Sequence, residues 1–388
     1  MKTITIGFFL MLLILPALYA SVSLEVGTDI LVETDGSVFV EIDSTLIETG
    51  TGYFKGKISS GSRTGMTEFA GLSLSAGING TIIRTTGAAY TKGNGEGINF
   101  KRYYEVNNTG GSMVTANMQI SYVSSGSNDE RNGLTGPYFV YRYISDWTGY
   151  GDGSSSSPVS GAGVQIPKGM SDWVISEGVR VATKVFLEGP YDTGTDQMST
   201  YLGSYLPTTS PYAEDARTVA SVPTGVTDWV LVQLRSTATG VILGARSCFL
   251  KADGNIVADD GATTFIDIKV KPGDYYVVIR HRNHLAVMTA SVITGLTWGV
   301  TPSTYDFTTA SDKYYGYDGA KELESGVWGM IAGDGNGDGG VYAEDYTLYK
   351  ANQGYEGYHA ADYNMDSGVY SDDYTIKKRN QGSETNVP

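Results

Sequence analysis

The sequence GDGNGDGGVYAEDYTLYKANQG occupies residues 333–354, and ADYNMDSGVYSDDYTIKKRNQG occupies residues 361–382, so the second copy begins 361 − 333 = 28 residues after the first. In both copies an acidic or amide residue recurs at every second position of the first half. The second half has the composition of a short helix and ends at Gly354 or Gly382, a helix stop signal. We therefore expect two acidic loops, each leading directly into a helix.

This alternation is typical of a loop that binds a hard cation. Calcium takes about six to eight oxygens, and a loop of about twelve residues can supply them from positions 1, 3, 5, 7 and 12, with a backbone carbonyl at position 7. The sequence thus predicts two calcium ions as cofactors. Magnesium is disfavoured, since it rarely accepts a cage made only of protein ligands. The predicted ligands are Asp334, Asn336, Asp338, the Gly340 carbonyl and Asp345 in the first loop, and Asp362, Asn364, Asp366, the Gly368 carbonyl and Asp373 in the second.

Two features of the loops favour modest affinity. Position 6 needs a tight turn, which suits Gly339 in the first loop better than Ser367 in the second. Asp345 and Asp373 stand at position 12, where an aspartate is one methylene shorter than the usual glutamate. We expect dissociation constants on the order of 10⁻⁶ to 10⁻³ M, suited to extracellular calcium.

The two copies, DGNGDGGVYAEDYTLYK and DYNMDSGVYSDDYTIKK, resemble the dockerin module, a duplicated calcium loop and helix, over about residues 328–385. Asp at position 12 and Val at position 8 (Val341 and Val369) carry this resemblance. It implies a cohesin-like protein partner, often one that attaches polysaccharide-degrading enzymes to a scaffold. It also implies that positions 10 and 11 help to choose the partner. Here these are Ala343-Glu344 and Ser371-Asp372, unlike the Ser-Thr pairs of the best-known recognition face.

The rest of the chain predicts a mainly β protein. Short alternating runs such as VRVATKVFLEG, with turns between them, indicate strands, and DWVLVQL, apolar on both faces, suits the centre of a sandwich. Residues 21–60 suit either a sandwich sheet or the rungs of a small β-solenoid. The Gly- and Ser-rich stretch at 149–163 places a boundary near residue 165. Residues 178–325 also resemble a β-sandwich that precedes such modules in secreted bacterial surface proteins. The expected parts are a signal peptide (1–20), an N-terminal β domain (21–165), a β-sandwich (166–325) and a dockerin-like module (326–388).

The composition of the chain indicates where the protein is located and which classes of partner are disfavoured. The start of the chain, up to Ala20, has one Lys, then an apolar run that ends in small residues, which predicts a signal peptide and a secreted or cell-surface protein. No later stretch is apolar enough to span a bilayer. The formal net charge of −15 disfavours nucleic acid, and residues 333–388 contribute 4 − 10 = −6 of it. The one cysteine, Cys248, is expected in a strand as a buried thiol.

One further candidate for a metal or catalytic site is the sequence RHRNH at residues 280–284. If these residues continue a strand, His281 and His284 face opposite ways and form no metal pair, so a hydrogen-bonded structural role is favoured. No G-x-S-x-G motif or other catalytic signature is present, and no catalytic residue is predicted. A glycosidase needs only two carboxylates, which leaves that class open.

The sequence therefore predicts a secreted, calcium-binding structural or adhesive protein and not an enzyme. Its dockerin-like module would fold with calcium and dock onto its own sandwich, a cohesin-like partner or another copy, the last giving a polymer. The alternative is a dockerin-tethered polysaccharide-degrading or carbohydrate-binding protein with a glycan ligand.

Overall fold

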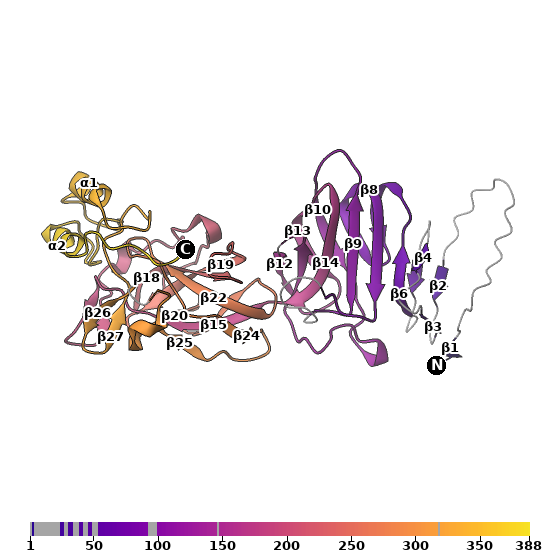
Figure 1. The fold of residues 1–388 in the computed structure, drawn as a ribbon, viewed down its shortest axis with the longest axis horizontal. Helices are drawn as coiled ribbons and strands as arrows, with labels where there is room; N and C mark the ends of the chain where they lie inside the picture. The colour runs from indigo at the N-terminus through magenta and orange to yellow at the C-terminus, as the bar shows by residue number, and fades with distance from the viewer. Residues whose placement is uncertain are drawn as a thin grey trace. The chain divides into compact units, whose positions relative to one another are not determined.

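The computed structural model describes residues 2–3, 24–26, 30–33, 39–41, 46–48, 53–91, 99–145, 147–316 and 319–388. Within these residues the chain is mainly β and carries two α-helices near its C-terminal end (Figure 1). It divides into two units. Unit 1 comprises residues 1–178 and 269–272, and unit 2 comprises residues 179–268 and 273–388. Apart from residues 2–3, the predicted signal peptide lies outside the described residues.

Unit 1 is built on one large sheet with the order β1-β3-β6-β8-β9-β14-β11-β12, to which β4, β7, β10 and β13 are added, and a separate β2–β5 pair. Its strands are β1 Lys2–Thr3, β2 Leu24–Val26, β3 Ile30–Glu33, β4 Phe39–Glu41, β5 Leu46–Glu48, β6 Tyr53–Ser59, β7 Arg63–Phe69, β8 Leu72–Thr86, β9 Arg102–Asn108, β10 Val114–Ile120, β11 Tyr138–Tyr143, β12 Trp147–Ser154, β13 Val159–Ile166 and β14 Gly169–Glu177.

The first strands pair in parallel, as solenoid rungs do. Leu24 pairs with Leu46, and Leu31 pairs with Tyr53, so the sequence offset is the same in both pairs (46 − 24 = 53 − 31). The offset differs in the other two parallel pairs, Lys2 with Ile30 (30 − 2 = 28) and Phe39 with Lys57 (57 − 39 = 18), so these strands stack in parallel without a fixed repeat. Within unit 1, the pairs among β8 to β14 are antiparallel. The first strands of unit 1 thus share the parallel pairing of solenoid rungs, and an antiparallel sheet follows them.

The middle of this sheet forms the core of unit 1. Trp173 on β14 pairs with Tyr104 on β9, and both side chains are completely buried. Strand β14 pairs with β9 on one side and with β11 on the other. The chain therefore leaves unit 1 after residue 178, whereas the sequence places the boundary near residue 165.

Unit 2 contains a β-sandwich followed by two helices. Its main sheet has the order β20-β19-β18-β22-β23 with β24 on β22, and β21-β15-β25 form a second sheet. The elements are β15 Val179–Lys184, β16 Tyr191–Asp192, β17 Gln197–Met198, β18 Val226–Arg235, β19 Gly244–Lys251, β20 Ile256–Val257, β21 Ile266–Ile268, β22 Gly273–Arg280, β23 Val287–Met288, β24 Ile293–Leu296, β25 Thr304–Asp306, β26 Lys321–Glu324, β27 Val327–Gly329, α1 Ala343–Asn352 and α2 Ser371–Arg379.

Strand β18 confirms the prediction for DWVLVQL. Every residue of β18 from 226 to 234 is buried, because β19 and β22 flank the strand and both of its faces are covered. Cys248 lies on the adjacent strand β19 and is a buried free thiol, as expected. Burial raises the pKa of this thiol, so it is a packed apolar group rather than a nucleophile.

Helices α1 and α2 begin directly after the two acidic loops, as predicted, and lie next to each other (Figure 1). Gly354 and Gly382, just beyond the helix ends, have φ angles of 89° and 91°. Glycine adopts this left-handed region without steric cost, which explains both stop signals.

The helical module is docked on the sandwich of its own unit. Glu188, 7% exposed, forms salt bridges with Arg379 at the end of α2 (2.6 Å) and with Lys321 (2.7 Å). Its second carboxylate oxygen accepts hydrogen bonds from the Ala332 amide (3.0 Å) and from Asn380 Nδ2 (2.5 Å). One sandwich carboxylate thus holds the end of α2 and the segment before the first loop.

The main chain of the sandwich also lies in direct contact with the main chain of the second loop. A Cβ placed on Gly189 would lie 1.7 Å from the carbonyl oxygen of Tyr363 and 3.2 Å from the Cα of Asn364. Residue 189 has to be glycine because the second loop rests directly on the main chain of the sandwich.

Gly189→Ala should therefore separate the second loop from the sandwich. We expect a loss of about 2 kcal/mol or more in the free energy of unfolding of unit 2, since no flexible side chain can move aside. Urea denaturation in millimolar calcium measures the loss. Gly111→Ala is the control, because a Cβ there meets nothing within 4 Å. Equal stability of both variants would contradict direct backbone packing.

Candidate metal centre

The first loop is wrapped around the carboxylate of Asp334. Its Oδ1 accepts hydrogen bonds from the amides of Gly337 (2.8 Å) and Asp338 (3.2 Å), and its Oδ2 accepts one from Gly339 (3.1 Å). Asp338 Oδ1 in turn accepts from the Gly340 amide at 3.1 Å. These short-range bonds fold the acidic stretch into a closed turn.

Asp345 joins the end of the first loop to its beginning. This residue lies in the first turn of α1, and its Oδ2 accepts from the Tyr342 amide at the helix start (2.7 Å). Its Oδ1 accepts from the amides of Gly335 (2.8 Å) and Asn336 (3.3 Å). One carboxylate thus caps the helix and closes the loop.

The second loop repeats this pattern at the equivalent positions. Asp362 accepts from the amides of Asp366 (3.2 Å) and Ser367 (3.1 Å). Asp373 accepts from the amides of Tyr363 (2.6 Å), Asn364 (3.2 Å) and Tyr370 (2.8 Å). Ser367 has a φ of 75°, so a non-glycine residue occupies the strained turn, as expected from the sequence.

The tyrosine at position 9 has a role that the sequence did not reveal. A Cβ on Gly340 would lie 2.2 Å from the Tyr342 ring, and one on Gly368 would lie 2.1 Å from the Tyr370 ring. Each ring covers the backbone whose carbonyl is the predicted ligand. The repeated Gly-Val-Tyr of both copies is the sequence signal of this packing.

Four carboxylates of the loops are buried without a salt bridge to a described lysine or arginine, although Arg282 lies near Asp362 and Lys377 near Asp345. Asp334 is 4% exposed, and Asp345, Asp362 and Asp373 are completely buried. Among the described residues, none of the four forms a salt bridge with a lysine or arginine. Burial raises the pKa of Asp334 and Asp373 to about 6 and that of Asp362 to about 7, although Arg282 opposes the last shift. Burial thus destabilises the ionised form of these carboxylates in the folded loops.

The donor set of the loops suits a hard cation. Each loop has two buried carboxylates, one exposed carboxylate (Asp338 or Asp366), an amide oxygen and a backbone carbonyl. A carboxylate offers about four lone-pair sites, so its bonds to amides leave capacity for a cation. These donors are all oxygen, as calcium prefers.

The predicted ligands share a loop, but their carboxylates do not already form a cluster. In the part of the chain that the structure describes, no group of three or more His, Cys, Asp or Glu side chains could hold a metal ion. The exposed carboxylates bond instead to a neighbouring amide, Asp338 to Asn336 Nδ2 (2.8 Å) and Asp366 to Asn364 Nδ2 (3.0 Å). Coordination would require these exposed side chains to turn inward.

The positions of His281 and His284 differ from the expectation that the two side chains face opposite ways. Strand β22 ends at Arg280, so residues 281–284 do not alternate as a strand. His281 and His284 therefore come together, with their Nδ1 atoms 3.1 Å apart. His281 Nε2 is 3.1 Å from the carboxylate of Asp228, and burial lowers the pKa of both imidazoles. Both imidazoles are buried and hydrogen-bonded, as the favoured interpretation expects, whereas the prediction that they face apart is wrong.

No protein-family model matches the chain, and no curated protein matches it. Solved structures that it is similar to include two type II cohesin–X-dockerin complexes from Acetivibrio cellulolyticus. An N-terminal interface mutant aligns at 15% identity over 54% of this chain and 96% of that chain, with a TM-score of 0.26. A C-terminal interface mutant aligns at 15% identity over 54% and 98%, with a TM-score of 0.29. Among the described residues, no helix has the length and the apolar run needed to cross a membrane.

Without calcium, the stability of unit 2 should fall as the pH rises from about 5 to 7.5. The folded chain keeps protons on Asp334, Asp373 and Asp362 up to pKa values of about 6 and 7, whereas their ordinary pKa is 3.8. The unfolded chain releases these protons first, so their stabilising effect is complete below pH 3.8 and lost above pH 7. Urea denaturation in EDTA at several pH values measures the fall.

The same titration in millimolar calcium should not show this loss, because calcium binds the ionised carboxylates. Asp334→Asn should weaken the dependence in EDTA by about one third, since Asp362 and Asp373 still titrate. A stability in EDTA that rises between pH 5 and 7.5 would contradict the assignment.

Proposed function

We propose that the two loops bind calcium and that the helical module is a calcium-dependent docking module of a secreted or cell-surface β protein. The observation that carries the proposal is the burial of four carboxylates in two matched loops, none with a salt bridge to a described basic residue and three with a pKa raised to about 6 or 7. Divalent cations bound in both loops would neutralise this charge and hold the exposed donors in place.

The outer faces of α1 and α2 form the surface that we propose for docking. Tyr346 and Tyr374 occupy equivalent positions in the two copies, and their ring centroids are 5.6 Å apart. They are 41% and 37% exposed, and Tyr374 also stacks on the buried Tyr349 at 5.7 Å. A rigid pair of exposed tyrosines is typical of the centre of a protein interface. We call this pair the tyrosine face.

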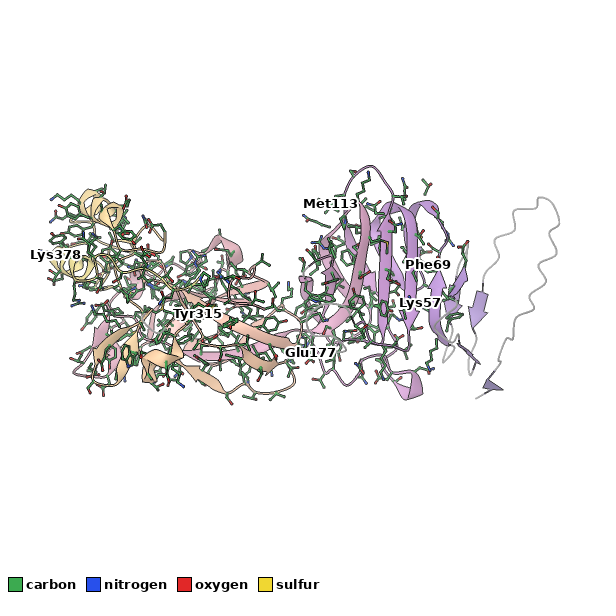
Figure 2. The ribbon with its side chains drawn as sticks, in the orientation of Figure 1. Lys57, Phe69, Met113, Glu177, Tyr315 and Lys378 are labelled. Atoms are coloured by element: carbon green, nitrogen blue, oxygen red, sulfur yellow. The ribbon has the colours of Figure 1, made fainter. Side chains whose placement is uncertain are left out.

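Charged residues surround the tyrosine face in a matched arrangement. Glu344 and Asp372 are exposed at the beginning of the helices, and Lys350 and Lys378 are exposed towards their ends. Figure 2 labels Lys378 on α2. Other parts of the module, the end of α2 and the second loop, contact Glu188 and Gly189 of the sandwich. The tyrosine face is thus left for a second molecule, which we propose is a cohesin-like module or another copy of this chain.

Calorimetric titration of the full chain with calcium tests the first part of the proposal. We expect two ions per chain, with dissociation constants on the order of 10⁻⁶ to 10⁻³ M. Asp345→Ala should remove one ion and Asp373→Ala the other. Asp253→Asn is the control, because Asp253 lies in the turn between β19 and β20, outside both loops. A wild-type chain that binds no calcium would refute the proposal.

Replacing both Tyr346 and Tyr374 with alanine tests the docking surface. We expect a loss of about 2 kcal/mol or more in the free energy of association, with calcium affinity unchanged. A type II cohesin module in calorimetry and the chain itself in light scattering, both in calcium, distinguish the two partners. Tyr201→Ala is the control, since Tyr201 is 73% exposed on the sandwich. Association that survives the double substitution would place the interface elsewhere.

A further inference from the structure

Asn283 of the sandwich lies against the first residues of both acidic loops. It is completely buried. Its backbone oxygen accepts a hydrogen bond from the amide of Gly333, the residue before Asp334, at 3.0 Å. Its side-chain Nδ2 donates to the carbonyl oxygen of Asp362 at 2.6 Å. Asn283, which lies outside both loops, thus contacts Asp362 at position 1 of the second loop. It also contacts Gly333, which directly precedes position 1 of the first loop.

The side chain of Asn283 is fixed by a buried histidine pair. Its Oδ1 is 2.8 Å from His284 Nδ1, while His284 Nε2 accepts a hydrogen bond from the Gly189 amide at 3.2 Å. In neutral His284 the proton therefore lies on Nδ1, which can donate to the Asn283 amide oxygen. This bond leaves Nδ2 of Asn283 directed at Asp362. The amide cannot rotate without breaking two buried hydrogen bonds.

The same network holds the segment before the second loop. The buried carboxylate of Asp228 accepts hydrogen bonds from Arg282 Nε and from the Tyr358 hydroxyl, both at 2.8 Å. Arg282 also donates to the carbonyl of His359. With the Asp362 carbonyl, the sandwich therefore fixes three points within residues 358–362.

We propose that Asn283 is a positioning residue that couples the two loops, so that calcium bound in one loop raises the affinity of the other. The inference rests on the proposed function. A cation in the first loop would fix Asp334, and with it the bond from Gly333 to Asn283. Asn283 then holds the Asp362 carbonyl in place before the second cation arrives. The first cation therefore contributes part of the entropy cost of ordering the second loop. The second cation then binds more tightly, which is positive coupling between the two sites.

A second path between the loops runs through Tyr363. Its hydroxyl is 3.4 Å from the carbonyl oxygen of Asp345, and a Cβ on Gly335 would lie 2.7 Å from that hydroxyl. The bond is much longer than the 2.6 Å bond of Asn283. Tyr363→Phe removes this bond and keeps the ring, so the two paths can be compared.

Calcium titration of the full chain measures the coupling. Asp338→Ala and Asp366→Ala each disable one loop through an exposed residue, and each variant then reports the affinity of the loop that remains. In the otherwise wild-type chain, we expect the affinity of each loop to be about tenfold higher when the other loop is occupied. With Asn283→Ala the factor should fall below about twofold, because the bond to Asp362 is lost while the backbone bond to Gly333 remains.

Two further variants separate coupling from general damage. Asn99→Ala removes an equally buried asparagine, whose Nδ2 donates to the Tyr90 carbonyl in unit 1, and should leave the factor near tenfold. If near-ultraviolet circular dichroism shows that Asn283→Ala is unfolded, Asn283→Leu keeps a similar shape without charge and removes the donor to Asp362, and the same loss is expected.

The outcomes are distinct. The proposal is overturned if the Asn283 variants leave the ratio of calcium affinities unchanged. It is also overturned if Tyr363→Phe abolishes this ratio while Asn283→Ala keeps it. A wild-type chain that binds two ions without any coupling refutes the coupling alone. A chain that binds no ion refutes the proposed function instead.

Discussion

Unit 2 buries four carboxylates, those of Asp334, Asp345, Asp362 and Asp373, and none of them forms a salt bridge with a described lysine or arginine. Arg282 near Asp362 and Lys377 near Asp345 offset only part of the cost of burial. A buried, unpaired carboxylate costs several kcal/mol even after local relaxation. Backbone amides offset part of this cost, because each carboxylate accepts two or three hydrogen bonds from its own loop. The loop turns, the helix starts and the tyrosine rings over the position 7 glycines all follow from keeping these groups in place. A cation in each loop is the simplest way to compensate the remaining charge.

The sandwich is part of this arrangement and not merely a neighbour. Two segments of the sandwich reach the module, one with Glu188 and Gly189 and the other with Asn283, and each residue contacts its backbone or a helix end. Such contacts orient a module more firmly than surface ion pairs would, since they are buried and include main-chain atoms. The side of the module that faces the sandwich is thus occupied. Tyr346 and Tyr374, by contrast, are exposed on the helices.

The local features could be predicted from the sequence, and the long-range ones could not. The two loops, both helices with their terminal glycines, and the buried strand around Cys248 follow from spacing and composition within short stretches of the chain. The contacts of Asn283 with Asp362 and of Glu188 with Arg379 span 79 and 191 residues, and no local pattern encodes them. His281 and His284 were misplaced because β22 ends at Arg280, and a strand end is poorly specified by alternation alone. The glycine at 189 gave no signal, since only the packed loop shows why a Cβ is forbidden.

Hydrogen exchange of the full chain in millimolar calcium and in EDTA shows whether the buried carboxylates need a cation. The amides of Gly335, Tyr342, Tyr363 and Tyr370 bond to the buried carboxylates, so their exchange reports the state of both loops. We expect slow exchange in calcium and much faster exchange in EDTA, while strands β8 to β14 of unit 1 stay unchanged. Equal exchange of the loop amides under both conditions would contradict this expectation, because the buried carboxylates would then be stable without a cation.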